Sequence, residues 1–169
     1  NFILKPYNIN NHFILINDGS TDNTQAFLEK FYKKLNKKVK KNIFLIENKK
    51  NKGSGYSFRK ALNICKTKYI MPMPGDNDVE FLDFKNYLKK DIDFLMFYPT
   101  NMERYSRNRY VLTMLFRMFY GYCFDIQVNY IQGPCIYKCK VLKRIKMYSD
   151  RVSFWPEINI KVLKSKIKY

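Results

Sequence analysis

The sequence predicts an α/β protein with a mainly parallel sheet flanked by helices. Short apolar runs alternate with segments whose apolar residues recur every three or four positions, as strands and helices do. Two of the apolar runs end in acidic turn sequences, at Asp18 and at Asp76. Because parallel strands bring their carboxyl ends to one edge of a sheet, we expect these turns to lie where ligands bind in such folds.

The order of elements follows from this periodicity. We expect strands at His12–Asn17, Asn42–Glu47, Tyr69–Met73 and Phe94–Tyr98. We expect helices at Ala26–Leu35, Tyr56–Cys65, Phe81–Lys89 and Ser153–Leu163. The first helix is expected to start after the turn and capping residues that follow the first strand. The second helix is expected to start after the loop with glycines that follows the second strand.

The second half carries a long apolar and aromatic stretch, Tyr110–Phe124, punctuated by arginines. Arg117 interrupts the stretch, which is shorter than the ~20 residues of a membrane-spanning helix. No segment is therefore predicted to cross a bilayer. Two interpretations stay open for Tyr110–Tyr122: a core helix, or a face that dips into a membrane surface.

Composition limits the class of protein. A chain of 169 residues with 46% hydrophobic content fits one domain, and its net charge of +18 attracts nucleic acid, anionic lipid or phosphorylated ligands. The run Lys33–Lys41 is either a solvated face or part of a binding surface. With four cysteines, a single histidine and no paired CxxC, the sequence does not favour a zinc site, and we expect reduced, buried thiols.

The acidic triplet Asp76-Asn77-Asp78 follows the third predicted strand. Two carboxylates one residue apart can share a hard divalent cation, Mg²⁺ or Mn²⁺, through oxygen ligands. Such a cation would bind a diphosphate. The alternative is that the triplet is only a turn that caps the next helix.

Three segments together resemble family 2 glycosyltransferases. Phe13–Thr24 resembles the family's strand followed by DDGSxD, and Asn51–Gly55, with Arg59 and Ala61, resembles its NxGxGxAxxxA loop and helix. Tyr69–Asp78 resembles the strand that ends in the DxD metal motif. The resemblance implies a Rossmann-like glycosyltransferase-A fold, the nucleotide-diphospho-sugar transferase fold.

The resemblance also implies roles for individual residues. Asp76 and Asp78 would be the catalytic and metal-binding residues. Asn17 stands where the family often has an aspartate that contacts the nucleobase, and its amide oxygen can still accept a hydrogen bond. Asp18 would support the loop or the ribose, and Arg59 is alternatively a solvated helix residue. The implied donor-binding set is Asn17, Asp18, Gly19, Ser20, Asn51, Gly53 and Arg59.

A phosphate acceptor fits the remaining residues better than a sugar hydroxyl. No acidic pair after the metal motif resembles the base that a hydroxyl acceptor needs, whereas arginines can hold an anionic phosphate. Tyr130–Pro134 and Phe154–Ile158 are similar to segments of the dolichol-phosphate mannosyltransferase-like group. The expected acceptor-binding set is Arg107, Arg109, Arg117, Gln132 and Glu157. Glu157 is alternatively a surface charge.

These observations predict a metal-dependent, inverting transferase of cell-envelope glycan biosynthesis. It would move a hexose from a nucleotide-diphosphate sugar to a polyprenyl phosphate of the dolichyl or undecaprenyl type. We expect a cytoplasmic protein, peripheral to the cytoplasmic face of a membrane. The alternatives are an inactive domain that binds nucleotide sugars or polyanions, and a basic nucleic-acid-binding protein, although core-facing strand aromatics make a nucleic-acid partner unexpected.

The domain expectation also follows from the resemblance. We expect one domain over residues 1–169, with a nucleotide-sugar-binding half at 1–98 and an acceptor half at 99–169. Family members begin with a further strand and helix before the DDGS strand, and continue beyond the last predicted helix. We therefore expect the domain to be incomplete at both ends.

Overall fold

The chain folds into two compact units in the computed structural model, which describes residues 12–75, 92–99, 106–133 and 135–165. Unit 1 comprises Asn1–Thr67 with Asp150–Val152. Unit 2 comprises Lys68–Ser149 with Ser153–Tyr169. Each unit combines strands with helices, and the predicted α/β class is confirmed.

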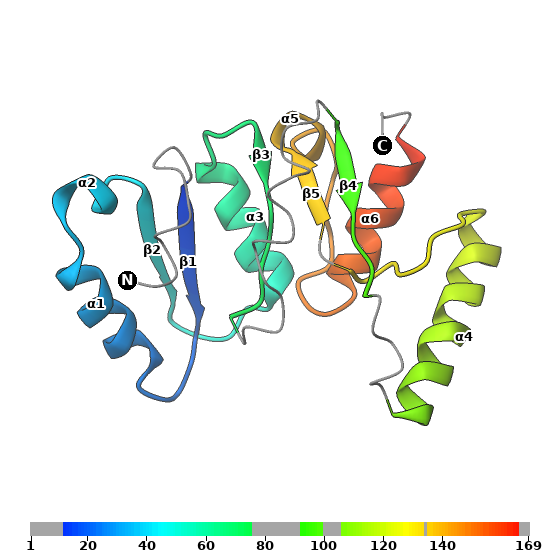
Figure 1. Ribbon diagram of the computed structural model, residues 1–169, viewed down its shortest axis with the longest axis horizontal. Coiled ribbons are helices and arrows are strands. Elements are labelled where there is room, and N and C mark those ends of the chain that lie inside the picture. The colour runs from blue at the N-terminus through cyan, green and yellow to red at the C-terminus, as the bar shows by residue number, and fades with distance from the viewer. Residues whose placement is uncertain (1–11, 76–91, 100–105, 134, 166–169) are drawn as a thin grey trace. The chain divides into compact units, whose positions relative to one another are not determined.

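Unit 1 contains a parallel pair of strands with helices packed against it (Figure 1). Its elements are β1 (Phe13–Asp18), α1 (Thr24–Lys34), α2 (Lys37–Lys40), β2 (Ile43–Asn48) and α3 (Ser54–Ile64). The two strands pair in register from Phe13 opposite Ile43 to Asp18 opposite Asn48. Helix α1 contacts β2, and α3 contacts β1. Both strands therefore end at the same edge, at Asp18 and Asn48.

Apolar spacing explains the packing of α3. Phe58, Ala61 and Leu62 recur at three- and four-residue intervals and are buried, so this helix presents one apolar face to the strands. Helix α2 begins where the Asn36 side chain accepts the Val39 N–H at 2.9 Å, which satisfies a backbone donor at the helix start. The capped helix α2 leads directly into β2.

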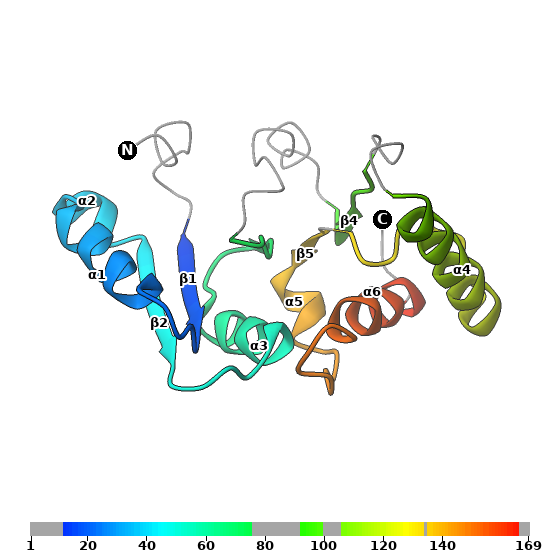
Figure 2. The same cartoon turned by 90° about the horizontal axis from the view of Figure 1, so that it is seen from below.

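Unit 2 contains an antiparallel sheet and two longer helices (Figure 2). Its elements are β3 (Tyr69–Ile70), β4 (Phe94–Met96), α4 (Arg107–Phe124), β5 (Cys135–Lys138), α5 (Cys139–Leu142) and α6 (Phe154–Lys164). The strand order is β3-β5-β4, and β5 is antiparallel to both neighbours. Strands β3 and β4 consequently run in the same direction. The predicted parallel pairing is found in unit 1, while β5 reverses the direction in unit 2.

The core of unit 2 joins its sheet to α6. The rings of Phe94 and Tyr137 stack with centroids 5.3 Å apart, and both side chains are buried. Phe154, Ile158 and Val162 of α6 are fully buried as well, at the four-residue spacing of one helix face. The predicted amphipathic helix at the C-terminal side is thus confirmed.

Several predictions about local structure need correction. The third strand ends at Ile70 and does not reach Met73, because Pro72 and Pro74 have no N–H to donate to a strand ladder. Three cysteines are buried as expected, whereas Cys123 is exposed on α4. The helix predicted at 81–89 lies outside the described residues.

Helix α4 is not a core helix, which removes one of the two interpretations of the aromatic stretch. None of its 18 residues is buried. The helix begins after Ser106 and ends at Asp125, which adopts the left-handed conformation that terminates helices. Among the helices that the structure describes, none is long and apolar enough to span a membrane.

Candidate functional site

The side chain of Asn17 closes the loop that follows β1. Its Oδ1 accepts the Ser20 N–H at 3.1 Å, and its Nδ2 donates to Gln25 Oε1 at 3.0 Å. Only 3% of Asn17 is exposed. An amide buried at this depth needs both hydrogen bonds, and here the loop and α1 supply them. Asn17 therefore shapes the turn from within, while Ser20 stays exposed on its outside.

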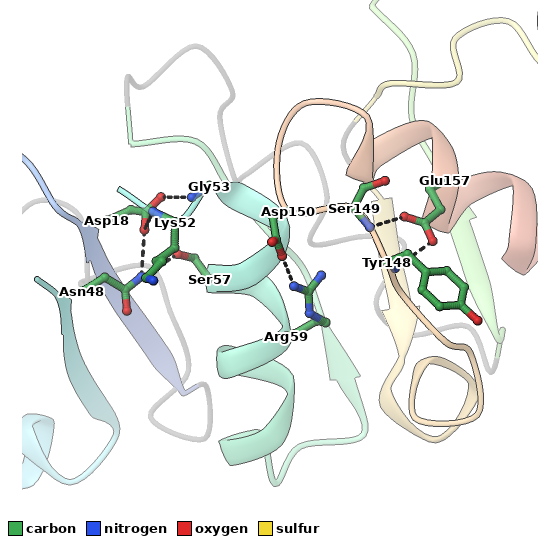
Figure 3. A network of polar contacts seen from close by, with 10 residues as sticks. All are labelled: Asp18, Asn48, Lys52, Gly53, Ser57, Arg59, Tyr148, Ser149, Asp150 and Glu157. Carbon is green, nitrogen blue, oxygen red and sulfur yellow. Dashed lines mark hydrogen bonds and ion pairs between the residues drawn. The ribbon is translucent and has the colours of Figure 1, made fainter. Parts of the chain in front are cut away.

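The carboxylate of Asp18 joins this loop to the loop before α3. It accepts N–H groups from Lys52 at 3.0 Å and Gly53 at 2.7 Å, and the Asn48 amide at 2.8 Å (Figure 3). Burial alone would raise the pKa of Asp18, but the hydrogen bonds from Asn48, Lys52 and Gly53 outweigh it and lower the pKa below the ordinary value. Asp18 is thus a loop-supporting anion.

Two glycines permit close approaches here: Gly19 between the two loops, and Gly53 between the second loop and the segment at Asp150. Gly19 has φ +71°, and a Cβ there would lie 2.3 Å from the Asn51 nitrogen. Gly53 has φ +93°, and a Cβ there would lie 2.2 Å from the Asp150 carbonyl oxygen. A side chain is excluded at both positions by conformation and by space. The structure therefore gathers Asn17, Asp18, Gly19, Ser20, Asn51 and Gly53 from the predicted donor set at one edge of unit 1.

Arg59 differs from the other predicted donor residues because its guanidinium pairs with Asp150 (Figure 3). The Asp150 carbonyl also accepts the Gly55 N–H at 2.7 Å. The segment Asp150–Val152 thereby packs on the start of α3. Arg59 holds a chain segment 91 residues away in sequence, and nothing local to either residue signals this pair.

A second polar cluster beneath Asp18 was not predicted. Asn48, which is buried, donates to Ser57 Oγ at 3.0 Å and accepts from Lys60 Nζ at 2.9 Å. Ser57 and Lys60 are three residues apart on α3 and so share a helix face. That spacing is the sequence signal that could have located them, once β2 was known to end at Asn48. The cluster connects the end of β2 to α3.

The predicted metal ligands Asp76 and Asp78 lie outside the described residues, which reach Gly75 on this side. Within the described ranges, no group of three or more His, Cys, Asp or Glu side chains could hold a metal ion. The divalent-cation site at Asp76 and Asp78 therefore stays a prediction from the sequence.

Three of the predicted acceptor residues line one pocket in unit 2. Arg109 and Arg117, about two turns apart on α4, line a cavity of about 190 Å³ together with Gln132. Leu112 and Phe116 of the same helix contribute apolar wall. Arg107 lies in the first turn of α4, is exposed, and does not line the pocket. The pocket thus combines two arginines with apolar residues, which suits an amphiphilic anion.

Glu157 is separate from that pocket and holds a loop of unit 2. Its oxygens accept the Tyr148 N–H at 2.9 Å and the Ser149 N–H at 2.8 Å (Figure 3). Glu157 also pairs with Lys161. Burial alone would raise the pKa of Glu157, but Lys161 and the two backbone donors lower the pKa to about 2. The Glu157 carboxylate is occupied by its own loop.

The outer surface of α4 exposes a continuous series of apolar side chains. Leu115, Met118, Phe119 and Tyr122 are each more than half exposed, and Tyr122 reaches 91%. The helix has no acidic residue and three arginines. Contiguous exposed apolar surface of this kind is uncommon on a monomeric protein and marks a binding surface.

Residues 3–145 match the family described as Glycosyl transferase family 2, and the chain belongs to this family. Its fold is accordingly the Rossmann-like glycosyltransferase-A fold. An uncharacterized protein of Methanocaldococcus jannaschii is 38% identical to the chain over 81 residues. That match covers 46% of this chain and 34% of the relative, so the chain matches about a third of the relative's length.

Proposed function

We propose that the chain transfers a hexose from a nucleotide-diphosphate sugar to a polyprenyl phosphate or a related lipid phosphate at a membrane surface. Membership of glycosyl transferase family 2 supports glycosyl transfer as the chemistry. The observation that carries the acceptor assignment is the pocket in which Arg109 and Arg117 share walls with apolar residues of α4. A dolichol-phosphate mannosyltransferase-like specificity belongs to this proposal.

The donor would bind at the loops gathered around Asp18. Asn17 and Asp18 contribute mainly by fixing these loops, since their polar atoms are engaged there. Ser20 and Asn51 are exposed at the same edge, where they could contact a ribose or a phosphate. Parallel strands that end at one edge provide such a site because backbone donors and side chains converge there.

The cation would bind Asp76 and Asp78. Two carboxylates one residue apart supply the hard oxygen ligands that Mg²⁺ and Mn²⁺ prefer. When bound, the cation would neutralise charge on the departing nucleoside diphosphate. This assignment rests on the sequence motif directly after Gly75.

A phosphate acceptor explains why the pocket contains arginines and no carboxylate among its lining residues. In an inverting transfer, an acceptor phosphate oxygen forms a bond to the anomeric carbon from the face opposite the diphosphate. The bond from that carbon to the diphosphate breaks, and the diphosphate takes the electron pair. The attacking oxygen is already anionic, so no general base has to remove a proton. Arg109 and Arg117 would orient it.

Helix α4 would lie in the interface of the membrane that presents this acceptor. Amphipathic interfacial helices insert their apolar face to a depth of ~5–10 Å. Helix α4 exposes apolar and aromatic side chains that could insert in this way. Its arginines and the absence of acidic residues suit the phosphate groups at that depth. The isoprenyl chain of the acceptor would then enter the pocket from the apolar side.

The test is a panel of UDP and GDP sugars with undecaprenyl phosphate in vesicles, in the presence of Mn²⁺ or Mg²⁺. We expect acceptor-dependent release of nucleoside diphosphate with at least one sugar, lost on chelation and in Asp78→Ala. Turnover that persists in Asp78→Ala and still requires metal would refute the assignment of that residue. Binding of a nucleotide sugar with no transfer would instead support an inactive binding domain, and tight, salt-sensitive RNA binding unaffected by sugar nucleotides would support the nucleic-acid alternative.

A further inference from the structure

Asn159 and Tyr137 form a buried polar pair behind one wall of the pocket. The Tyr137 hydroxyl donates to Asn159 Oδ1 at 2.6 Å, and Asn159 Nδ2 donates to the Ile131 carbonyl at 2.6 Å. Asn159 is 0% exposed and Tyr137 is 1% exposed. Tyr137 lies on β5, Asn159 on α6, and Ile131 in the segment between α4 and β5.

A buried asparagine in α6 costs desolvation free energy unless its amide forms hydrogen bonds. The other buried residues close to it in α6, Ile158, Ile160 and Val162, are apolar. Burial of an amide requires compensation at each polar atom, whereas an apolar residue of similar size needs none. The compensation here comes from Tyr137 and from the peptide carbonyl of Ile131. The pair therefore connects the core of unit 2 to that carbonyl.

Ile131 itself belongs to the pocket wall. One wall of the cavity is the segment Asn129–Gln132, and α4 contributes Arg109 and Arg117 to the same cavity. Asn159 thus holds the wall from behind at Ile131, next to Gln132.

The same wall is held a second time at Gly133. A Cβ at Gly133 would lie 2.2 Å from the Phe97 carbonyl oxygen, so only glycine fits against β4's continuation. The Cys135 thiol donates to the Gly133 carbonyl at 3.2 Å. Burial raises the pKa of Cys135 to about 12, so the thiol keeps the proton that it donates. Gln132, which is exposed, sits between two residues fixed to the core.

We infer that Asn159 and Tyr137 are positioning residues for the acceptor pocket, setting where Gln132 stands relative to Arg109 and Arg117. They contact no ligand themselves. They act by restraining the Ile131 carbonyl, and through it the adjacent Gln132. This inference rests on the proposed acceptor role of the pocket.

The test compares Asn159→Leu with Ile158→Val in the full chain. Both substituted residues are buried in α6, but only Asn159→Leu removes the hydrogen bond to the Ile131 carbonyl. We expect Asn159→Leu to raise the KM for undecaprenyl phosphate about tenfold, with the KM for the donor and acceptor-independent donor hydrolysis changed less than twofold. Tyr137→Phe, which keeps the ring, should shift the acceptor KM in the same direction. Ile158→Val should leave the acceptor KM unchanged.

A merely structural role would give a different pattern. If Asn159→Leu lowers the melting temperature and moves donor and acceptor constants together, the positioning role is overturned. Hydrogen exchange of the amides at 130–133 gives a readout independent of catalysis: we expect faster exchange in Asn159→Leu and not in Ile158→Val. Unchanged exchange there would also overturn the inference. If the wild type neither binds nor glycosylates undecaprenyl phosphate, the proposed function fails by itself, while the exchange result still decides whether Asn159 restrains the wall.

Discussion

Asp18 Oδ2 accepts the N–H of Gly53 at 2.7 Å, which joins two loops 35 residues apart in sequence. Gly19, next to Asp18, has no space for a Cβ against Lys50 and Asn51 of the partner loop, so the carboxylate and this glycine together determine how closely the loops approach. Asp18, Gly19 and Gly53 of the predicted donor set therefore hold the two loops together. The contributions of the carboxylate and of the glycines to loop stability can be measured separately, by substituting Asp18 or a glycine of these loops.

Asp18→Asn should loosen the loop pair without changing the size of the side chain. One acceptor oxygen becomes an amide nitrogen, which leaves the Lys52 or the Gly53 N–H without its partner. Hydrogen bonds to charged groups contribute about 1.5–3 kcal/mol, and we expect a loss of free energy of unfolding near the lower end of that range. Chemical denaturation at pH 7 measures it. Because the folded pKa is lowered, the wild-type advantage is present above the ordinary pKa and is lost as the pH falls below it. An advantage that persists at low pH would contradict this role.

Gly53→Ala should be more damaging than Gly75→Ala. Gly53 has positive φ and its Cβ would meet the Asp150 carbonyl, whereas a Cβ at Gly75 has nothing within 4 Å. Unfavourable backbone conformation alone costs about 1–3 kcal/mol, and the contact adds to it. We expect a clear decrease in melting temperature for Gly53→Ala and little change for Gly75→Ala. Equal stability of the two variants would show that the loop can move away from Asp150.

Glu157→Gln should reduce stability in a pH-dependent way. The folded pKa of about 2 lies below the ordinary 4.5, so the carboxylate stabilises the fold fully above pH 4.5 and loses that effect as the pH falls from 4.5 to 2. The variant loses the ion pair with Lys161 and weakens the hold on Tyr148 and Ser149, at a cost of about 2 kcal/mol at pH 7. Unfolding curves of both proteins across this range measure the difference. Curves separated equally at pH 2 and pH 7 would argue against this assignment.

Arg117→Ala should weaken acceptor use selectively. The guanidinium lines the pocket with Arg109, and loss of one charge-assisted contact to a phosphate costs about 1.5–3 kcal/mol, or roughly a tenfold or greater increase in the acceptor KM. The acceptor KM of Arg117→Lys should lie between those of Arg117→Ala and the wild type, because lysine keeps the charge but not the planar, forked guanidinium. Arg144→Ala, an exposed arginine of the same unit outside the pocket, is the matched control. Similar effects from Arg117→Ala and Arg144→Ala would indicate a general charge effect.

Met118→Glu with Tyr122→Glu should abolish the attraction of α4 to lipid. Both side chains are mostly exposed, so the folded protein tolerates the change, whereas insertion would bury two carboxylates. We expect at least a tenfold loss in cosedimentation with anionic vesicles and an unchanged melting temperature. Phe27→Glu replaces an aromatic on α1 that is 70% exposed, and it should retain binding apart from a small charge effect. If Phe27→Glu lowers vesicle binding as much, α4 is not the interfacial element.

Much of the fold could be predicted from local pattern. The strand ends at Asp18 and Asn48 and the helices α1, α3 and α6 lie within a residue or two of the expected positions, because periodicity and turn chemistry act over short distances. The third strand was too long in the prediction, since its apolar character concealed the effect of two prolines. The exposure of α4 could not be predicted, because an apolar helix fits a core and a membrane surface equally well.

The sequence by itself determined the α/β class, the family and the loops in which the predicted donor residues gather. Only the tertiary structure decided what those residues touch: Asp18 supports the loop before α3, Arg59 pairs with Asp150, and Glu157 holds its own loop. It also brought Arg117 and Gln132 to one pocket. The reason is physical: helix and strand formation depend on neighbours along the chain, whereas the partner of a polar side chain depends on which distant backbone donors packing brings within about 3 Å.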